Sequence, residues 1–381
     1  MKASIINIGN ELLDGKIRNG NAEFIMQELS NIGIPVIRQQ IVMDSEEEII
    51  DALERNEDAD LILTTGGLGT TDDDKSRASV LKYLDSKNVS YETIDMDNKY
   101  GYFKGAFYKH DKGGIMIFPG PPREMNNMLR SHIDLLIDED MHTARKTYRI
   151  SFLNEWDTHD ILRKEGISTD YVNTFVDSDG SCYLKLYMED KNRDTLGARF
   201  KEVDEKIYNT FGPLIYTNED ISREQMLIKD LINKNLSISC AESYTGGKII
   251  SSLIEIPEAS KVIEEAFIVY SNEAKHEILN VNIDLIKEYG VVSEEVCKAM
   301  LDGLYKKTNS DVCIATTGFA GPGGDAGKVF IGIKYLNKNY VFEKKLYPSR
   351  RYIINKSKNF AIDYTTLIIN DNLSKGLKKI K

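Results

Sequence analysis

The chain of 381 residues has few cysteines, no long hydrophobic run and no excess of positive charge. Its four cysteines lie far apart and form no C-x-x-C pair, which argues against a disulfide framework or a cysteine-built metal site. No stretch approaches the roughly 18 continuous apolar residues of a membrane span, and residues 1–7 lack the apolar core of a signal peptide. A net charge of −11 disfavours a nucleic-acid surface. We therefore expect a cytoplasmic protein that binds neither membranes nor nucleic acid directly.

Length and hydrophobic pattern indicate several domains. A chain of 381 residues exceeds the size at which a single core keeps growing. Two long segments alternate short apolar runs with amphipathic helical patterns, which is typical of parallel sheets covered by helices. Between them, the alternation at Tyr148, Ile150 and Phe152 indicates half-buried strands. We predict an α/β fold: two three-layer α/β domains with mainly parallel sheets, at 1–145 and 221–381, joined by a small α+β module at 146–220.

A Gly-rich turn at residues 241–247 joins a predicted strand to a predicted helix. Such a turn collects free backbone N–H groups at the positive end of the helix, which favours anions such as phosphate. It also holds Ser243 on a rigid support, so Ser243 is the candidate nucleophile. The simpler alternative is that this serine only caps the helix.

Two further loops of the last domain follow predicted strands. Lys275 is the candidate base, and burial must lower its pKa from the usual value of ~10.4 for that role. Tyr270 could relay or orient the proton, while Thr317 and the N–H of Gly318 could stabilise an oxyanion. Alternatively, Lys275 is a solvated helix residue, Tyr270 is an ordinary strand aromatic, and Thr317 and Gly318 form a tight turn.

Loops of the first domain carry a second group of candidates. Asp73 and Asp74 could bind Mg²⁺ or a similar cation that bridges phosphates, or they could add negative charge to the first turn of a helix. Other carboxylates also follow predicted strands. The predicted N-terminal site comprises Glu11, Gly66, Gly67, Gly69, Thr71, Asp73, Asp74 and Glu124, with Asp73 and Asp74 as metal ligands.

The six loops together resemble one known family. The loops at 241–247, 270–275 and 317–324 are similar to those of the nicotinamide-nucleotide amidase (PncC-type) domain. The loops at 9–15, 66–74 and 119–125 resemble those of the molybdopterin-binding-like (MoaB/MogA-type) domain. Their order, with a small module between, resembles the full-length CinA competence/damage-inducible family over nearly the whole chain. The resemblance implies hydrolysis of nicotinamide mononucleotide to nicotinate mononucleotide and ammonia, with no cofactor required for the amidase.

The same resemblance implies further properties. In some members the first domain is a metal-assisted ADP-ribose pyrophosphatase, but the segment between about Leu84 and Gly114 is short here, which argues against that activity. We expect a homodimer. A non-enzymatic nucleotide-binding scaffold associated with competence is the alternative to the enzyme. The implied substrate-binding residues are Thr245, Gly246 and Gly247 at the phosphate, a hydroxyl at Ser260, Gly318, and Arg350 or Arg351 from the last long helix.

Overall fold

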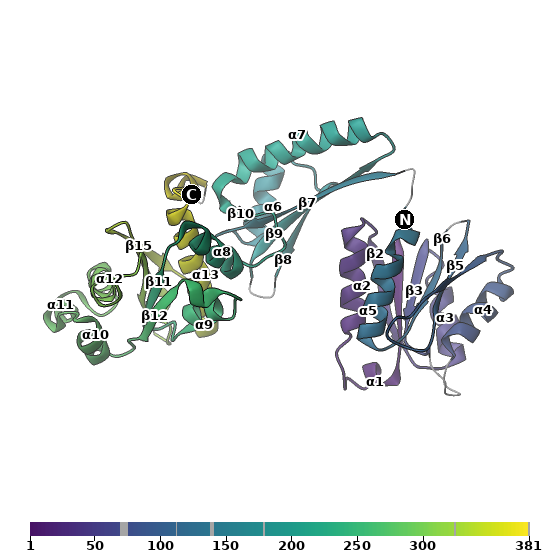
Figure 1. Cartoon of the computed structure of the whole chain (residues 1–381), viewed down its shortest axis with the longest axis horizontal. Coiled ribbons are helices and arrows are strands. Elements are labelled where there is room, and N and C mark those ends of the chain that lie inside the picture. Colours follow the sequence, from purple (N-terminus) through teal and green to yellow (C-terminus); the bar gives the residue numbers. More distant parts are fainter. Residues whose placement is uncertain (69–74, 112, 138–140, 178–179, 324, 380–381) are drawn as a thin grey trace. The chain divides into compact units, whose positions relative to one another are not determined.

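The computed structural model describes residues 1–68, 75–111, 113–137, 141–177, 180–323 and 325–379. Contacts divide the chain into two compact units, Met1–Thr143 with Glu189–Leu196 and Ala144–Met188 with Gly197–Lys381 (Figure 1). Among the described helices, none has the length and apolar character needed to cross a bilayer. The domain boundaries at 145 and 220 stay a prediction.

A six-stranded sheet with helices on both faces forms the first unit (Figure 1). Its strands are β1 (Ala3–Ile8), β2 (Val36–Val42), β3 (Leu61–Thr65), β4 (Glu92–Met96), β5 (Gly105–His110) and β6 (Gly113–Phe118). Its helices are α1 (Asn10–Leu13), α2 (Gly20–Asn31), α3 (Glu46–Glu54), α4 (Ser76–Ser86), α5 (Pro122–His132) and the 3₁₀ turn η1 (Ile133–Leu136).

The strand order in this sheet is β2-β1-β3-β6-β5-β4. The first four strands pair in parallel, whereas β5 and β4 continue the sheet antiparallel, within the short segment between about Leu84 and Gly114. Successive residues of a strand face opposite sides. Accordingly Ile5 packs in the core beneath α2 and α5, and Ile6 packs in the core beneath α3 and α4.

A four-stranded sheet with two helices follows. Its strands are β7 (His142–Ile150), β8 (Val172–Val176), β9 (Cys182–Asp190) and β10 (Ile215–Thr217), in the order β10-β7-β9-β8. Its helices are α6 (Glu155–Lys164), α7 (Arg193–Phe211) and the 3₁₀ turn η2 (Gly212–Leu214). Every second residue of β9 from Cys182 to Met188 is buried, so one face of this strand packs in the core.

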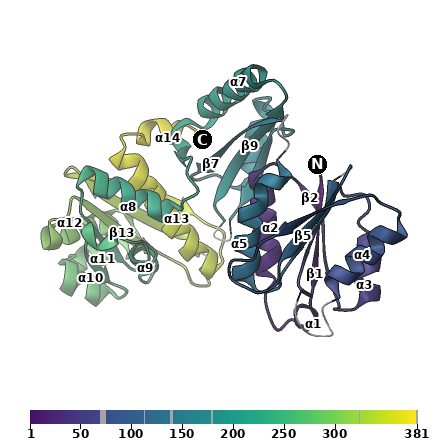
Figure 2. The same cartoon turned by 45° about the vertical axis from the view of Figure 1, so that its right-hand side comes forward.

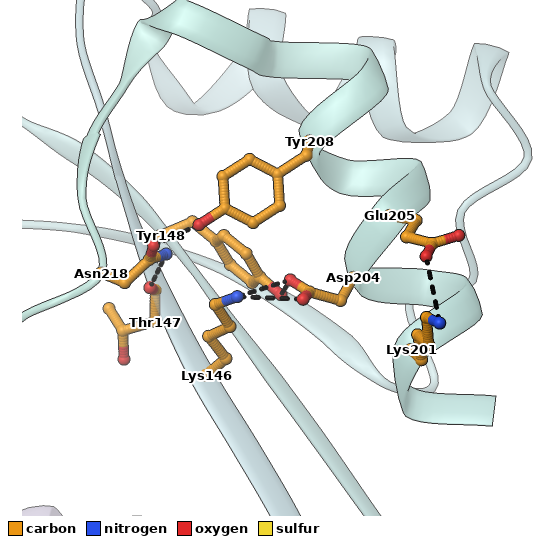
Figure 3. A network of polar contacts seen from close by, with 8 residues as sticks. All are labelled: Lys146, Thr147, Tyr148, Lys201, Asp204, Glu205, Tyr208 and Asn218. Carbon is orange, nitrogen blue, oxygen red and sulfur yellow. Dashed lines mark hydrogen bonds and ion pairs between the residues drawn. The ribbon is translucent and has the colours of Figure 1, made fainter. Parts of the chain in front are cut away.

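Polar contacts attach α7 to β7 (Figure 3). The Nζ of Lys146 lies 2.9 Å from both carboxylate oxygens of Asp204, and the Tyr148 hydroxyl donates a hydrogen bond to the same carboxylate. The Lys146 ammonium also lies over the rings of Tyr148 and Tyr208. Because these groups face one another, they position the helix on the sheet.

The last part of the chain is a second α/β sheet (Figure 2). Its strands are β11 (Ile238–Glu242), β12 (Ile263–Ile268), β13 (Val312–Gly318), β14 (Lys328–Tyr335) and β15 (Lys338–Lys345). Its helices are α8 (Arg223–Lys234), α9 (Lys248–Ile254), α10 (Asn272–Leu279), α11 (Ile283–Tyr289), α12 (Glu294–Thr308), α13 (Arg350–Ile369) and α14 (Leu373–Lys379), with a 3₁₀ turn η3 (Ala259–Lys261).

The strand order β12-β11-β13-β14-β15 sets the place of the candidate site. The three strands β12, β11 and β13 are parallel, so their carboxyl ends meet at one edge of the sheet. Helices α8, α9 and α13 cover one face, and α10, α11 and α12 cover the other. This three-layer α/β arrangement confirms the predicted fold class.

Candidate active site

Ser243 directly follows the carboxyl end of the buried strand β11, which lies between β12 and β13. The chain turns immediately, through Gly246 and Gly247 at φ of 60° and 89°, and enters α9. This left-handed region is open to glycine at low cost, so the two glycines allow the tight turn. The N–H of Ser243 donates to the carbonyl of Thr316 at 3.2 Å, which ties the turn to the end of β13.

Lys275 reaches Ser243 from the neighbouring helix. Ser271 caps α10 by accepting from the N–H of Ala274. The Lys275 side chain is fully buried, and its Nζ lies 3.1 Å from Ser243 Oγ. The same Nζ lies 2.9 Å from the carbonyl oxygen of Val269 and 3.2 Å from that of Tyr270. The helix-surface alternative for Lys275 is therefore wrong.

Burial lowers the pKa of Lys275 to about 8, although the nearby Glu273 carboxylate opposes the shift. At neutral pH roughly a tenth of such an amine is uncharged, far more than for an exposed lysine. A neutral amine keeps two N–H donors and one lone pair. If the carbonyls of Val269 and Tyr270 accept the two N–H bonds, the lone pair faces Ser243 Oγ. This arrangement suits a base that takes the proton of a serine hydroxyl.

A cavity of about 480 Å³ opens beside this pair. Apolar walls come from Val291, Val292 and Phe319. A pocket of this size that combines apolar walls with a few polar groups suits a small molecule. Of the predicted residues, Ser243, Tyr270, Lys275, Thr317, Gly318 and Arg350 line this cavity.

Thr317 has a different role from the one expected. Its hydroxyl is buried and donates to the carbonyl of Val291 at 2.7 Å. A hydroxyl that already donates its proton cannot donate it to an oxyanion as well. The expectation of an oxyanion donor at the Thr317 hydroxyl is therefore corrected to a structural role.

The backbone N–H of Gly318, expected to stabilise an oxyanion, is not used in the pairing of β13 with β14. The next residue, Phe319, donates its N–H to Lys328 on β14, so Gly318 belongs to a non-hydrogen-bonded pair of this antiparallel ladder. Its N–H thus points away from β14, on the side of β13 where Ser243 follows β11. A Cβ at this position would lie 2.9 Å from the Tyr244 ring, so the packing requires glycine.

Tyr270 contributes mainly its backbone. Its side chain is 62% exposed at the cavity, while its carbonyl oxygen accepts from Lys275. Within residues 180–323, no hydrogen bond joins the phenol to Ser243 or to Lys275. A role of Tyr270 in proton relay stays a prediction.

The turn expected to hold phosphate has another partner. The Glu242 carboxylate accepts hydrogen bonds from the N–H groups of Gly247, Ile249 and Ile250 at 2.9–3.1 Å. The Thr245 hydroxyl is buried against that of Thr316, with 2.8 Å between the oxygens. Of the three residues expected to hold phosphate, Gly247 therefore donates to the Glu242 carboxylate, Gly246 donates its N–H to the carbonyl of Ser243, and the Thr245 hydroxyl contacts Thr316, so that expectation is corrected.

The remaining residues that were predicted to bind substrate do not all lie at the cavity. Ser260 is exposed in η3, which precedes β12, so it lies at the opposite edge of the sheet from Ser243. A strand of six residues such as β12 spans about 20 Å, which excludes direct contact between the two hydroxyls within one chain. Arg350 and Arg351 begin α13, and only Arg350 is among the described residues that line the cavity.

The candidate site of the first domain is described only in part. Gly66 and Gly67 follow β3, Glu11 is exposed after β1, and the Glu124 carboxylate accepts from Asn98 at 2.7 Å. No group of three or more His, Cys, Asp or Glu side chains in the described part of the chain could hold a metal. The metal site stays a prediction, because Gly69, Thr71, Asp73 and Asp74 lie outside the described residues.

Fold and site together define a two-part α/β protein with a buried serine–lysine pair at the strand ends of its last domain. Residues 220–368 match the family model described as "CinA C-terminal domain", and residues 4–138 match the model "Probable molybdopterin binding domain". A competence-damage inducible protein of Clostridium beijerinckii is 34% identical, covering 92% of this chain and 95% of the relative. One of Clostridium botulinum is 31% identical, with coverages of 96% and 98%.

The chain belongs to the CinA family of competence/damage-inducible proteins. A solved CinA superfamily structure from Escherichia coli is 29% identical and covers 39% of this chain and 88% of that chain, with a TM-score of 0.37. These relatives are named without a stated activity.

Proposed function

We propose that the last domain hydrolyses the carboxamide of nicotinamide mononucleotide to nicotinate mononucleotide and ammonia. The observation that carries the proposal is the 3.1 Å contact between Lys275 Nζ and Ser243 Oγ at the wall of a cavity. A buried amine beside a hydroxyl is an activated nucleophile, and acyl transfer is the reaction that such a pair performs. Membership of the CinA family supports the choice of substrate through the resemblance of its last domain to the amidases.

In the first half of the reaction, the neutral Lys275 amine accepts the proton of the Ser243 hydroxyl. Oγ bonds to the carboxamide carbon, and the carbonyl electron pair moves onto its oxygen, which the N–H of Gly318 faces. The tetrahedral intermediate then collapses. Its C–N bond breaks, the Lys275 ammonium returns its proton to the departing nitrogen, and ammonia leaves an ester on Ser243.

In the second half, water replaces ammonia. Lys275 accepts a proton from the water, the water oxygen bonds to the ester carbon, and the C–Oγ bond breaks as Oγ regains a proton from Lys275. The product is the nicotinate carboxylic acid, which loses its proton to solvent. Ser243 and the neutral amine are regenerated, so the cycle needs no cofactor.

The test is ammonia release from nicotinamide mononucleotide by the purified protein, with nicotinate mononucleotide measured as the second product in equal amount. Absence of both products would favour the alternative, a nucleotide-binding scaffold that retains the fold. Release of ammonia without nicotinate mononucleotide would indicate a different reaction at the same site.

The pH dependence of kcat/KM should follow the protonation of the Lys275 amine. Since the reaction needs neutral Lys275, whose pKa is about 8, we expect kcat/KM to rise between about pH 6 and 8 and to level off above. The Glu273 carboxylate raises the pKa of Lys275, so Glu273→Gln should move the rising limb to lower pH. Steady-state rates across this range measure both effects. A flat profile in the parent protein would exclude Lys275 as the base.

Arg350 is the proposed partner of the substrate phosphate, because it is the cationic side chain at the described cavity wall besides Lys275. A charged hydrogen bond of this kind contributes about 1.5–3 kcal/mol, so Arg350→Gln should raise KM for the mononucleotide about tenfold or more. The matched control is Arg351→Gln, which removes the same charge one residue along and outside the described lining.

Two comparisons decide the role of Arg350. KM of the Arg351→Gln variant should stay within about twofold, since an exposed charge outside the cavity is screened by solvent and salt. Nicotinamide riboside, which lacks the phosphate, should show no difference between the parent and Arg350→Gln. Equal KM values for both arginine variants would place the phosphate elsewhere.

A further inference from the structure

The side chain of Glu242 is buried beside the nucleophile that follows it in the chain. It is 1% exposed, and it ends the buried strand β11. One of its carboxylate oxygens accepts from the N–H groups of Gly247 and Ile249, each at 3.1 Å, and the other accepts from Ile250 at 2.9 Å. All three donors belong to the start of α9.

These contacts fix both ends of the turn that carries Ser243. The backbone of Glu242 is fixed in the sheet by parallel pairing with β12 and β13, and its carboxylate fixes the first turn of α9. Ser243 is the first residue of the loop between these two fixed points. The negative charge is suited to this place, because the N-terminal N–H groups of a helix are unpaired and carry partial positive charge.

We propose that Glu242 is the positioning residue of the active site: its carboxylate holds the turn so that Ser243 Oγ stays within reach of Lys275. This inference rests on the proposed function. It also explains what occupies the N–H groups of a Gly-rich turn of the kind that is typical of phosphate sites. The Glu242 carboxylate is the anion at this turn, and Arg350 is the proposed partner of the substrate phosphate.

A positioning role for Glu242 and a general role in stabilising the fold predict different effects on the kinetics. Glu242 is not among the groups that shift the pKa of Lys275, so its removal should leave the pH of the rising limb unchanged. It does not line the described cavity, so KM should also change little. A displacement of the nucleophile by about 1 Å can lower a rate about 100-fold. The expected signature is therefore a loss of kcat alone.

The test compares Glu242→Gln with Ser293→Ala in the full-length protein. Ser293 also caps a helix of this domain, α12, by accepting from the N–H of Val296, but it does not line the described cavity. We expect Glu242→Gln to lower kcat on the order of 10–100-fold with KM within about twofold, and Ser293→Ala to keep kcat. Glu242→Asp keeps the charge on a shorter side chain and should recover part of the rate.

A second readout needs no substrate turnover. A fluorophosphonate probe reacts with an activated serine, and its rate of labelling at Ser243 should fall in Glu242→Gln and stay unchanged in Ser293→Ala. If the parent protein labels but does not release ammonia, the proposed function fails, and slower labelling of Glu242→Gln still supports the positioning role. Equal labelling and equal kcat in Glu242→Gln and the parent would overturn the positioning role and leave the proposed function intact. A parent that neither labels nor releases ammonia would overturn both.

Discussion

Replacing Ser243 by alanine should lower kcat for ammonia release by at least about 10⁴-fold, because the variant has no oxygen that can form the ester. The substitution removes one hydroxyl from a buried position whose backbone contacts remain. We therefore expect the variant to stay folded and to bind nicotinamide mononucleotide with nearly unchanged affinity. Single-turnover ammonia release and calorimetric titration measure the two quantities.

Ser239→Ala is the matched control. Ser239 lies on the same strand, and its buried hydroxyl contacts that of Ser310 at 2.7 Å and accepts from the N–H of Glu265. Its loss should cost about 1 kcal/mol of stability and leave kcat within about twofold, since it lies at the far end of β11. If Ser243→Ala and Ser239→Ala showed equal residual rates, Ser243 would not be the nucleophile.

The sequence predicted the members of the serine–lysine pair but not the contacts that make it work. Strands are predicted before the turn at 241–247 and before the loop that carries Lys275, and β11 and β12, which form there, are parallel, so their carboxyl ends bring Ser243 and Lys275 to one edge. The carbonyl oxygens of Val269 and Tyr270 that hold the amine are backbone atoms. Sequence carries no signal for them, because every residue has such an oxygen.

Side-chain conformation explains where the sequence interpretation was wrong. A Gly-rich turn before a helix is compatible with phosphate or with a carboxylate from the chain, and only the orientation of Glu242 decides between them. The available signal was a charged residue ending an apolar run, directly before the turn. Similarly, the Thr317 hydroxyl could point to the cavity or to a neighbouring loop, and the structure directs it to Val291.

The order of strands in the first domain was also beyond the sequence pattern. The parallel strands β1, β3 and β6 were expected from their apolar runs. In contrast, charged and polar residues outnumber apolar ones in β4 (Glu92–Met96). This strand lies at the edge of the sheet and is largely exposed. Edge strands of this kind lack the hydrophobic pattern by which strands are recognised.

Breaking the buried ion pair between α8 and α13 should strongly destabilise the last domain. Arg223 and Asp363 are 4% and 2% exposed, and the guanidinium also contacts the Ser181 hydroxyl, which lies just before β9. Burial raises the pKa of Asp363 even though Arg223 opposes the shift, so ionising this carboxyl is costly without its partner. Asp363→Ala removes the carboxylate that the buried Arg223 guanidinium contacts and should destabilise the fold by about 3–5 kcal/mol.

Two further variants separate the ion pair from packing. Glu219→Ala removes the carboxylate from the exposed pair with Lys229, another side chain of α8, and should cost less than about 1 kcal/mol. The double variant Arg223→Met with Asp363→Leu removes both charges and should be more stable than Asp363→Ala alone, because the buried guanidinium is removed together with its carboxylate. Urea unfolding followed by hydrogen exchange in peptides from α8 and α13 measures these differences. Equal stability of Asp363→Ala and Glu219→Ala would mean that water reaches Arg223. The ion pair would then not stabilise the packing of α8 near Ser181, just before β9.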